Sequence, residues 1–445
     1  MEKYQSYKPS GVEWIGEIPE KWRISKFKYV SKLYTGNSLN DEQKVLYESE
    51  DEYHIPYVSS KDIDLNTRSV NYNNGLRIPK ENNPLKVSPK DSFLLCVEGG
   101  SSGRKMVYLD REVCFVNKLC SFKSVENTRF QYYFIQSSNF QDKFKLSLSG
   151  LIGGVSISTL RDFELVLPSI QEQHQIVQFL DNKTELIDKL ISTKERKITL
   201  LKEQRTSLIN QVVTKGLNPN VKLKDSGVEW IGEIPEHWKS CNLRYVLELL
   251  TDFESNGSFS SVKENVKVDD EGEVWYVRMT DLENNNIRNE KCKYCDLDTY
   301  NFLHKTKVYG GELLITKRGE IGKVYLFPYN CGLSTLGPNS YLLRLKNIVN
   351  SHFLYFFYIS DIGQTTLKLL DNSTTIGSLY KDDIKGSSVI VPPIDEQQQI
   401  VEYLVSKTKE IDDLVQLEQK KIDLLKQYRQ SLISEVVTGK IKVTN

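Results

Sequence analysis

Two glycine-rich segments with adjoining basic residues are the parts of this 445-residue chain whose residue types could do chemistry. The first half reads LLCVEGGSSGRK and the second reads LLITKRGEIGK, with Gly-x-x-Gly at Gly100–Gly103 and Gly319–Gly322. Glycines allow a tight turn whose backbone N–H groups approach phosphate oxygens, and adjoining bases can reach phosphates or guanine edges. The segments predict either a fold-determining turn or a DNA contact made by Ser101, Ser102, Arg104, Lys105, Lys317, Arg318 and Lys323.

A second candidate surface follows a repeated Tyr-Val pair in each half. Ser59, Ser60 and Lys61 follow the first pair, and Arg278, Met279 and Thr280 follow the second. The surrounding strand pattern repeats while these residues differ, as expected if one scaffold presents two different DNA-reading surfaces. Drift without constraint would give the same pattern. Ser59, Ser60, Lys61, Arg278 and Thr280 therefore join the candidate DNA-binding residues.

Catalytic motifs are missing from the sequence. There is no GxxxxGK[ST] loop, no GxGxxG after a strand and no HExxH. Cys292 and Cys295 form one CxxC, but no second pair follows at zinc spacing, so the pair is interpreted as incidental. We therefore expect no catalytic centre and no metal site in this chain.

The chain is a tandem duplication. SGVEWIGEIPEKW at 10–22 returns as SGVEWIGEIPEHW at 226–238, and Leu94-Leu95 aligns with Leu313-Leu314, which sets Glu98 and Gly99 against Lys317 and Arg318. The tryptophans of the repeated motif are either protein-contact anchors or packed on their own domains. Strand and turn signals make each half β-rich, with few short helices. The predicted domains are 1–168, a helix at 169–216, then 217–392 and a final helix at 393–445.

Heptad patterns predict two long helices, one closing each half. In parallel pairing Arg205 would face Arg429 inside the seam, whereas antiparallel pairing sets Lys194 opposite Glu418. We expect the antiparallel arrangement with Lys194 and Glu418 as a partly buried pair; the alternative places both at a solvated edge. The predicted pairing positions are Leu180, Ile187, Lys194, Leu201, Leu208, Leu404, Ile411, Glu418, Leu425 and Leu432.

Composition limits the possible partners. The 59 basic and 59 acidic side chains give a net charge of zero, which excludes a polycation that holds DNA by bulk attraction. Local basic patches remain compatible with DNA binding. No apolar run reaches the roughly 18 residues of a membrane span. Seven scattered cysteines favour a reducing cytoplasm over a disulfide scaffold.

The repeated motifs together resemble the specificity subunit of type I restriction-modification systems. The resemblance rests on SGVEWIGEIP-x-x-W, on the helix start P-x-x-x-EQ-x-x-I-V (Glu172-Gln173 and Glu396-Gln397) and on the Gly-x-x-Gly segments, and it covers essentially the whole chain. It implies an α+β fold: two β-rich target-recognition domains joined by two long helices in an antiparallel coiled coil, with pseudo-two-fold symmetry. Each domain would read one half of a bipartite DNA site, and the coiled coil would set the spacing.

The same resemblance implies partners and cofactors. Two modification subunits would methylate adenine with S-adenosylmethionine, and restriction subunits would translocate and cleave double-stranded DNA with ATP and Mg²⁺. This chain would bind none of these cofactors and would catalyse no step. The alternative is a coiled-coil scaffold whose duplicated β domains bind proteins. With zero net charge, we expect weak DNA binding by the chain alone.

Overall fold

The computed structural model describes residues 2–149, 153–283, 287–371 and 377–443. The chain forms two compact units: unit 1 comprises Met1–Glu195 with Gln419–Asn445, and unit 2 comprises Arg196–Glu418. Each unit contains a β-rich head and a segment of each long helix, α6 (Ile170–Lys215) and α13 (Ile394–Val437). In the described part of the chain, no helix has both the length and the apolar character needed to cross a bilayer.

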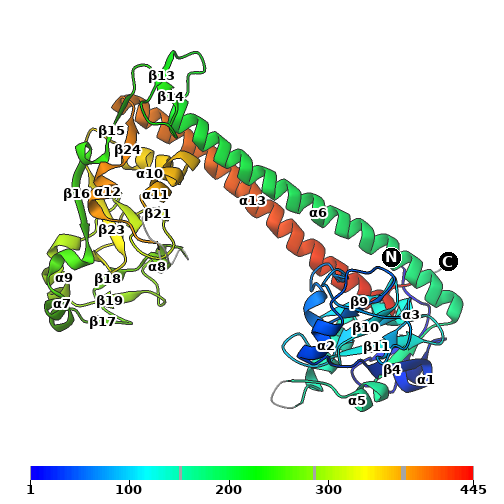
Figure 1. Cartoon of the computed structure of the whole chain (residues 1–445). Helices are drawn as coiled ribbons and strands as arrows, with labels where there is room; N and C mark the ends of the chain where they lie inside the picture. The colour runs from blue at the N-terminus through cyan, green and yellow to red at the C-terminus, as the bar shows by residue number, and fades with distance from the viewer. Residues whose placement is uncertain (1, 150–152, 284–286, 372–376, 444–445) are drawn as a thin grey trace. The chain divides into compact units, whose positions relative to one another are not determined.

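The two long helices run antiparallel, as the heptad pattern predicts. Within unit 2, Lys197 Nζ lies 3.0 Å from Glu418 Oε1, and Arg205 Nε lies 3.0 Å from Asp412 Oδ1. The residue number rises along α6 while the partner's number falls along α13, which is possible only for antiparallel helices. Unit 1 repeats the Arg205 contact, with Arg429 of α13 bound to Asp188 of α6 (Figure 1, α6 in green and α13 in red).

The helix seam is mostly apolar but includes one buried acid. Leu180, Ile187, Leu404, Ile411 and Leu432 are buried, while Leu201, Leu208 and Leu425 are half-buried. Glu418 is only 2% exposed and accepts a hydrogen bond from Lys197, so it does not lie at a solvated edge. The pairing of Glu418 with Lys194 stays a prediction.

The two heads repeat the topology of their first sheet and share a parallel strand pair in their second sheet. The first sheet of each is antiparallel in the same order, and the second contains one parallel pair. In unit 1 the sheets run β4 (Ser31–Thr35), β11 (Leu119–Ser124), β8 (Phe93–Cys96), β9 (Met106–Tyr108), and β6 (Arg77–Ile78), β5 (Ile55–Val58), β10 (Val113–Phe115), β7 (Val87–Ser88). In unit 2 they run β16 (Leu247–Asp252), β23 (Ser340–Leu345), β20 (Leu313–Thr316), β21 (Val324–Leu326), and β17 (Val268–Asp269), β19 (Lys293–Cys295), β18 (Val274–Val277), β22 (Ser334–Leu336).

The chain enters and leaves each head through a pair of adjacent strands. β3 (Arg23–Lys26) pairs with β12 (Glu164–Leu167) in unit 1, and β15 (Lys239–Asn242) pairs with β24 (Ser388–Val391) in unit 2. Each head is therefore a loop of chain closed by a two-stranded neck. We call residues 27–163 head 1 and residues 243–387 head 2.

Aromatic packing holds each head to its helices. Phe93 and Phe122 stack at 4.7 Å on the first sheet of head 1, which α3 (Thr128–Phe134) covers. Trp22 and Trp238 of the repeated N-terminal motif are buried, so they pack within their own units. Trp14 and Trp230 remain partly exposed and donate hydrogen bonds to Glu164 and Thr366 of their own units.

Candidate nucleic-acid interface

In each unit the structure brings the two predicted segments together. In unit 1, Lys105 follows the glycine turn between β8 and β9, and its Nζ donates to the carbonyl oxygen of Ser60 at 2.8 Å. In unit 2, Lys323 follows the turn between β20 and β21 and pairs with Glu283, just after the segment 278–280. The glycine turn and the segment after β5 or β18 therefore form one surface in each head.

The segments after β5 and β18 are braced by a buried aspartate at the same position. Ser59 donates to Asp62 Oδ2 through its hydroxyl at 2.6 Å and its backbone N–H at 2.8 Å. Arg278 donates to Asp281 through Nε at 3.1 Å and Nη2 at 2.6 Å, and Nη2 also donates to Lys291 O at 2.9 Å. Ser59 and Arg278 therefore stabilise their own turns, while Lys61 and Thr280 are exposed beside them.

The strand registers correct the alignment of the two glycine turns. The backbone N–H of Gly99 donates to Gly153 O at 3.0 Å, and that of Gly319 donates to Gly377 O at 3.0 Å. Gly99 is thus the counterpart of Gly319, and Glu98 is the counterpart of Arg318. The predicted match of Glu98 and Gly99 with Lys317 and Arg318 is wrong by one residue, because the paired strands before the turns align Leu94 with Leu314 and not with Leu313.

The second glycine of each turn is required by the fold. Gly103 has φ +75°, and a Cβ there would lie 2.6 Å from Phe144 Cδ1. Gly322 has φ +94°, and a Cβ there would lie 2.6 Å from Gln364 Oε1. The fold-determining interpretation therefore holds for these two positions. Gly99 and Gly319 are also left-handed but have open space beside them, so the exposed side of each turn is clear.

Most of the predicted DNA-contacting cations of head 2 are already paired within the head. Arg278 is held by Asp281, and Lys323 by Glu283 and by Glu320. Lys317 Nζ lies 2.7 Å from Asp252 Oδ2 and 2.9 Å from Glu254 Oε2. Arg318 differs, since it is exposed and forms no ion pair within the described residues.

Lys317 belongs to a buried ionic network. Asp252 also accepts from Lys381 Nζ at 2.6 Å and from the hydroxyl of Ser255 at 2.5 Å. Burial alone would raise the pKa of Asp252, but the hydrogen bonds from Lys317, Lys381 and Ser255 outweigh it and hold that pKa well below its usual range. Lys317 therefore satisfies a buried carboxylate, which gives it a role in folding, and its contact with DNA stays a prediction.

The cations of head 1 remain uncompensated. Arg104 is exposed and donates to Gly100 O, while Lys105 donates to the backbone of Ser60. Lys61 is exposed. In the described part of unit 1, none of these three pairs with a carboxylate. Ser101 and Ser102 are half-buried in the turn, and the hydroxyl of Ser102 is enclosed without a hydrogen-bond partner among the described atoms.

Lys118 and Asn339 are exposed residues that lie beside the two turns, and the sequence did not indicate them. Val97 N–H donates to Lys118 O at 2.9 Å, and Lys317 N–H donates to Asn339 O at 2.8 Å. Both acceptors precede a strand that pairs with the strand before the turn, β11 with β8 and β23 with β20. Only the strand pairing indicates this position, and no local motif marks it. Lys118 adds a fourth positive charge to the head 1 surface.

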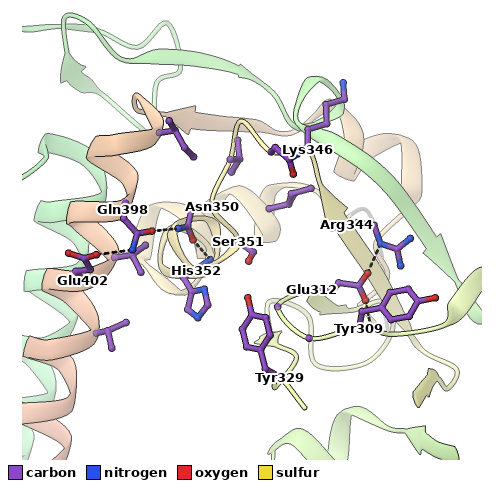
Figure 2. A pocket seen from close by; sticks show the side chains of 18 residues that line it. Tyr309, Glu312, Tyr329, Arg344, Lys346, Asn350, Ser351, His352, Gln398 and Glu402 are labelled. Carbon is purple, nitrogen blue, oxygen red and sulfur yellow. Dashed lines mark hydrogen bonds and ion pairs between the residues drawn. The ribbon is translucent and has the colours of Figure 1, made fainter. Parts of the chain in front are cut away.

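Figure 2 shows a pocket of about 800 Å³ in unit 2, between head 2 and the first turns of α13. Its buried acid, Glu312, accepts from Arg344 Nε at 2.6 Å and from Tyr309 N–H at 2.6 Å. The rings of Tyr329 and His352 lie parallel with centroids 6.2 Å apart. Glu312 and Arg344 thus satisfy each other, and the pocket contains none of the predicted DNA-binding residues.

Comparison with known proteins gives a consistent result. The family model described as "Type I restriction modification DNA specificity domain" matches residues 19–200 and 235–432. The putative type I restriction enzyme MjaX specificity subunit of Methanocaldococcus jannaschii is 25% identical over 295 residues, covering 65% of this chain and 62% of that protein. The type I restriction enzyme MjaVIII specificity subunit of the same organism is 21% identical over 442 residues, covering 96% of this chain and 95% of that protein.

A solved structure shares the fold. It is described as "Structural basis underlying complex assembly and conformational transition of the type I R-M system". Its chain aligns with a TM-score of 0.72 at 14% sequence identity, covering 95% of this chain and 99% of that one.

Proposed function

The chain belongs to the type I restriction-modification DNA specificity family, and on that premise we propose that each head reads one half of a bipartite, asymmetric site in double-stranded DNA. The chain is the specificity subunit and catalyses no step itself. Head 1 contacts DNA through the turn 99–105 with Lys61, and head 2 through the turn 317–323 with Thr280.

One observation carries the proposal: the two heads present the same pair of joined segments with different side chains. Lys105 and Lys323 fasten the glycine turn to the segment after the Tyr-Val strand in both heads. The residues that remain exposed differ, since Glu98 stands where head 2 has Arg318. Arginine is suited to guanine and an acid to the cytosine amino group, so a common scaffold offers two different readings of a major groove.

The long helices would set the separation of the half-sites and receive the modification subunits. In unit 1, Leu186 and Leu190 of α6 and Leu424 of α13 are about half exposed. In unit 2 the same is true of Leu200 of α6 and Leu417 of α13. Exposed leucines clustered on helices are typical of surfaces that a partner covers. We assign these surfaces to two modification subunits, to which restriction subunits would add.

The cofactors of the reaction would lie on those partners. S-adenosylmethionine would bind the modification subunits, and ATP with Mg²⁺ the restriction subunits, in the cytoplasm. Across the described residues, no group of three or more His, Cys, Asp or Glu side chains is arranged to hold a metal ion.

The neck strands define an experiment. Head 2 (243–387) is replaced by a second copy of head 1 (27–163), and the complex with the modification subunits methylates genomic DNA. The register joins Lys26 to Glu164 and Asn242 to Ser388, so each junction lies at the end of a paired strand. We expect methylation to move from an asymmetric site to a symmetric one built from two inverted copies of the first half-site.

The reciprocal chain, with head 2 in both places, is the matched control and should give the other symmetric site. The readout is the sequence context of methylated adenines. Retention of the original asymmetric site by both chimaeras would refute the proposal. Methylation that no longer depends on either head would support the alternative, in which the heads bind proteins.

A further inference from the structure

A groove in unit 1 contains an unusual concentration of arginine and tyrosine. It has a volume of about 540 Å³ and lies between head 1 and the long helices. Its walls include Arg68, Arg129 and Arg429 together with Tyr108, Tyr132 and Tyr133. It lies outside the surface assigned to DNA reading, and a volume of this size is typical of small-ligand sites.

The charges in the groove balance except at one residue. Arg129 Nη2 lies 2.9 Å from Asp181 Oδ1, and Arg429 Nε lies 2.9 Å from Asp188 Oδ1. The remaining lysine and glutamate of the lining, Lys189 and Glu185, pair at 2.6 Å. Four cations and three carboxylates line the groove, so one positive charge is left over, and it belongs to Arg68.

Arg68 is half-buried, and one nitrogen of its guanidinium is held away from water without a partner. Its Nη1 is enclosed and has no hydrogen-bond partner among the described atoms, and the side chain forms no ion pair there. Burial lowers the pKa of its guanidinium. A guanidinium does not lose its proton in proteins, so an enclosed one requires an anion or acceptors to offset the loss of water. Asp188 acts on Arg68 only across the groove, and no described atom accepts a hydrogen bond from Nη1.

The loop that carries Arg68 is rigidly preorganised. Asp64 Oδ1 accepts from Asn66 N–H at 2.8 Å, from Thr67 N–H at 2.7 Å and from the Thr67 hydroxyl at 2.9 Å. Arg68 itself has φ +54°, a left-handed conformation that an arginine adopts only where the surroundings impose it. Strained residues of this kind are concentrated at ligand-binding sites.

Unit 2 provides an internal comparison. Arg288 follows the buried Asp281 as Arg68 follows Asp62, and it also has a left-handed φ, +47°. Its guanidinium is fully used, because Nη1 donates to Cys331 O at 2.6 Å and Nη2 donates to Glu273 O at 2.9 Å. The duplicated arginine is therefore satisfied by backbone in one unit and left open to the groove in the other.

We propose that this groove binds the phosphate group of a nucleotide, with Arg68 as the main anion ligand. A phosphate oxygen at Nη1 supplies the missing acceptor, and guanidinium groups match phosphate geometry with two parallel hydrogen bonds. Of the tyrosines that line the groove, Tyr132 and Tyr133 are buried, and Tyr108 is the partly exposed ring that a base could contact. The phosphate comes from a free nucleotide or from the DNA backbone. The proposal stands without the DNA-reading function of the heads.

The test is calorimetric titration of the full chain with ADP, inorganic phosphate and adenosine at constant ionic strength. We expect ADP and phosphate to bind and adenosine to bind at least about tenfold more weakly, since a lost charge-assisted contact is of that order. Arg68→Gly is the main variant, because glycine accepts the left-handed backbone while removing the guanidinium. It should weaken ADP binding about tenfold or more.

Two further variants make the result specific. Arg111→Gln is the matched control, since Arg111 is an exposed arginine of head 1 that pairs with Asp110 outside the groove, and it should bind ADP as the wild type does. Asp188→Asn removes a carboxylate that faces Arg68 across the groove, so it should tighten ADP binding.

A parallel titration of the full chain with double-stranded DNA identifies the source of the phosphate. Binding of ADP supports a free nucleotide. Loss of duplex affinity on Arg68→Gly without any binding of ADP or phosphate supports the DNA backbone. The proposal is overturned if Arg68→Gly binds every phosphate probe as the wild type does, or if no probe binds the wild type.

Discussion

Lys317 and Arg318 are neighbours in sequence, yet the structure predicts opposite consequences for their replacement. In Lys317→Met, Asp252 loses one of two lysine partners while its own side chain is only 6% exposed. Removing one partner from a buried pair costs about 3–5 kcal/mol. Asp252 keeps Lys381 and Ser255, and Lys317 is partly reached by water, so we expect about 2 kcal/mol, or a fall in Tm of about 4–8 °C for a domain of this size.

The stability that Lys317→Met loses should depend on pH. The pKa of Asp252 is depressed in the folded chain, so the contact contributes its full stability above the unfolded value of about 3.9. That contribution disappears as pH falls toward the lower folded pKa. Urea unfolding followed by circular dichroism should therefore show the wild type and Lys317→Met separated at pH 7 and converging below about pH 4.

Arg318→Ala should leave stability within about 0.5 kcal/mol of the wild type, because the side chain is exposed and has no ion pair among the described residues. If Arg318 contacts a base, its loss costs about 1–3 kcal/mol, or roughly 5-fold to 150-fold in affinity for the second half-site. The assay is methylation of duplexes that carry each half-site alone or both.

Two results would refute this assignment. If Lys317→Met kept the wild-type Tm but lost second half-site methylation, Lys317 would leave Asp252 to contact DNA. If Arg318→Ala reduced methylation at both half-sites equally, Arg318 would serve folding or bind a phosphate instead of a base.

Three further predictions test the helix spacer, the glycine turn of head 1 and the buried acid of the helix seam. Deleting one heptad from both α6 and α13 shortens each helix by about 10 Å, so the preferred spacing of methylated half-sites should fall by about 3 base pairs. Gly103→Ala should destabilise head 1 by about 2 kcal/mol or more in thermal unfolding, whereas Gly100→Ala, at an open position whose backbone is not left-handed, should have little effect. Glu418→Leu should keep or raise the free energy of unfolding measured in urea, because an apolar residue replaces a buried charge and the freed Lys197 is about half exposed.

The long helices could be predicted from the sequence because their pattern is local. Hydrophobic residues at heptad spacing indicate a seam, and the like charges of Arg205 and Arg429 exclude a parallel pair. The structure pairs each of these arginines with an aspartate of the facing helix, Asp412 and Asp188. Repetition likewise placed the glycine turns, since both halves preserve the strand before the turn.

The sequence could not show which candidate side chains are already paired with a carboxylate, because their partners are distant in sequence. Lys317 meets Asp252 from 65 residues earlier, and the two are joined only when β16 and β20 both pair with β23. The Leu-Leu pairs of β8 and β20 are one residue out of register with each other, which displaced the predicted alignment of Glu98, and only the strand registers could correct it. Arg68 belongs to no motif, and its enclosure depends on the fold around it.

The ion pairs of head 2 show how the chain's equal numbers of acidic and basic side chains are arranged there. In head 2 the acids of the same head neutralise Arg278, Lys317 and Lys323, which leaves Arg318 as an exposed cation at the proposed DNA surface. Few free cations in head 2 mean few counterions released when it binds, and hence a small sequence-independent affinity, whereas Lys61, Arg104 and Lys105 of head 1 have no carboxylate partner among the described residues. A subunit that must discriminate between sequences benefits from this arrangement, since non-specific attraction competes with its own target. On the proposed function, the bulk attraction would come from the modification and restriction subunits, while this chain would supply the difference in affinity between one sequence and another.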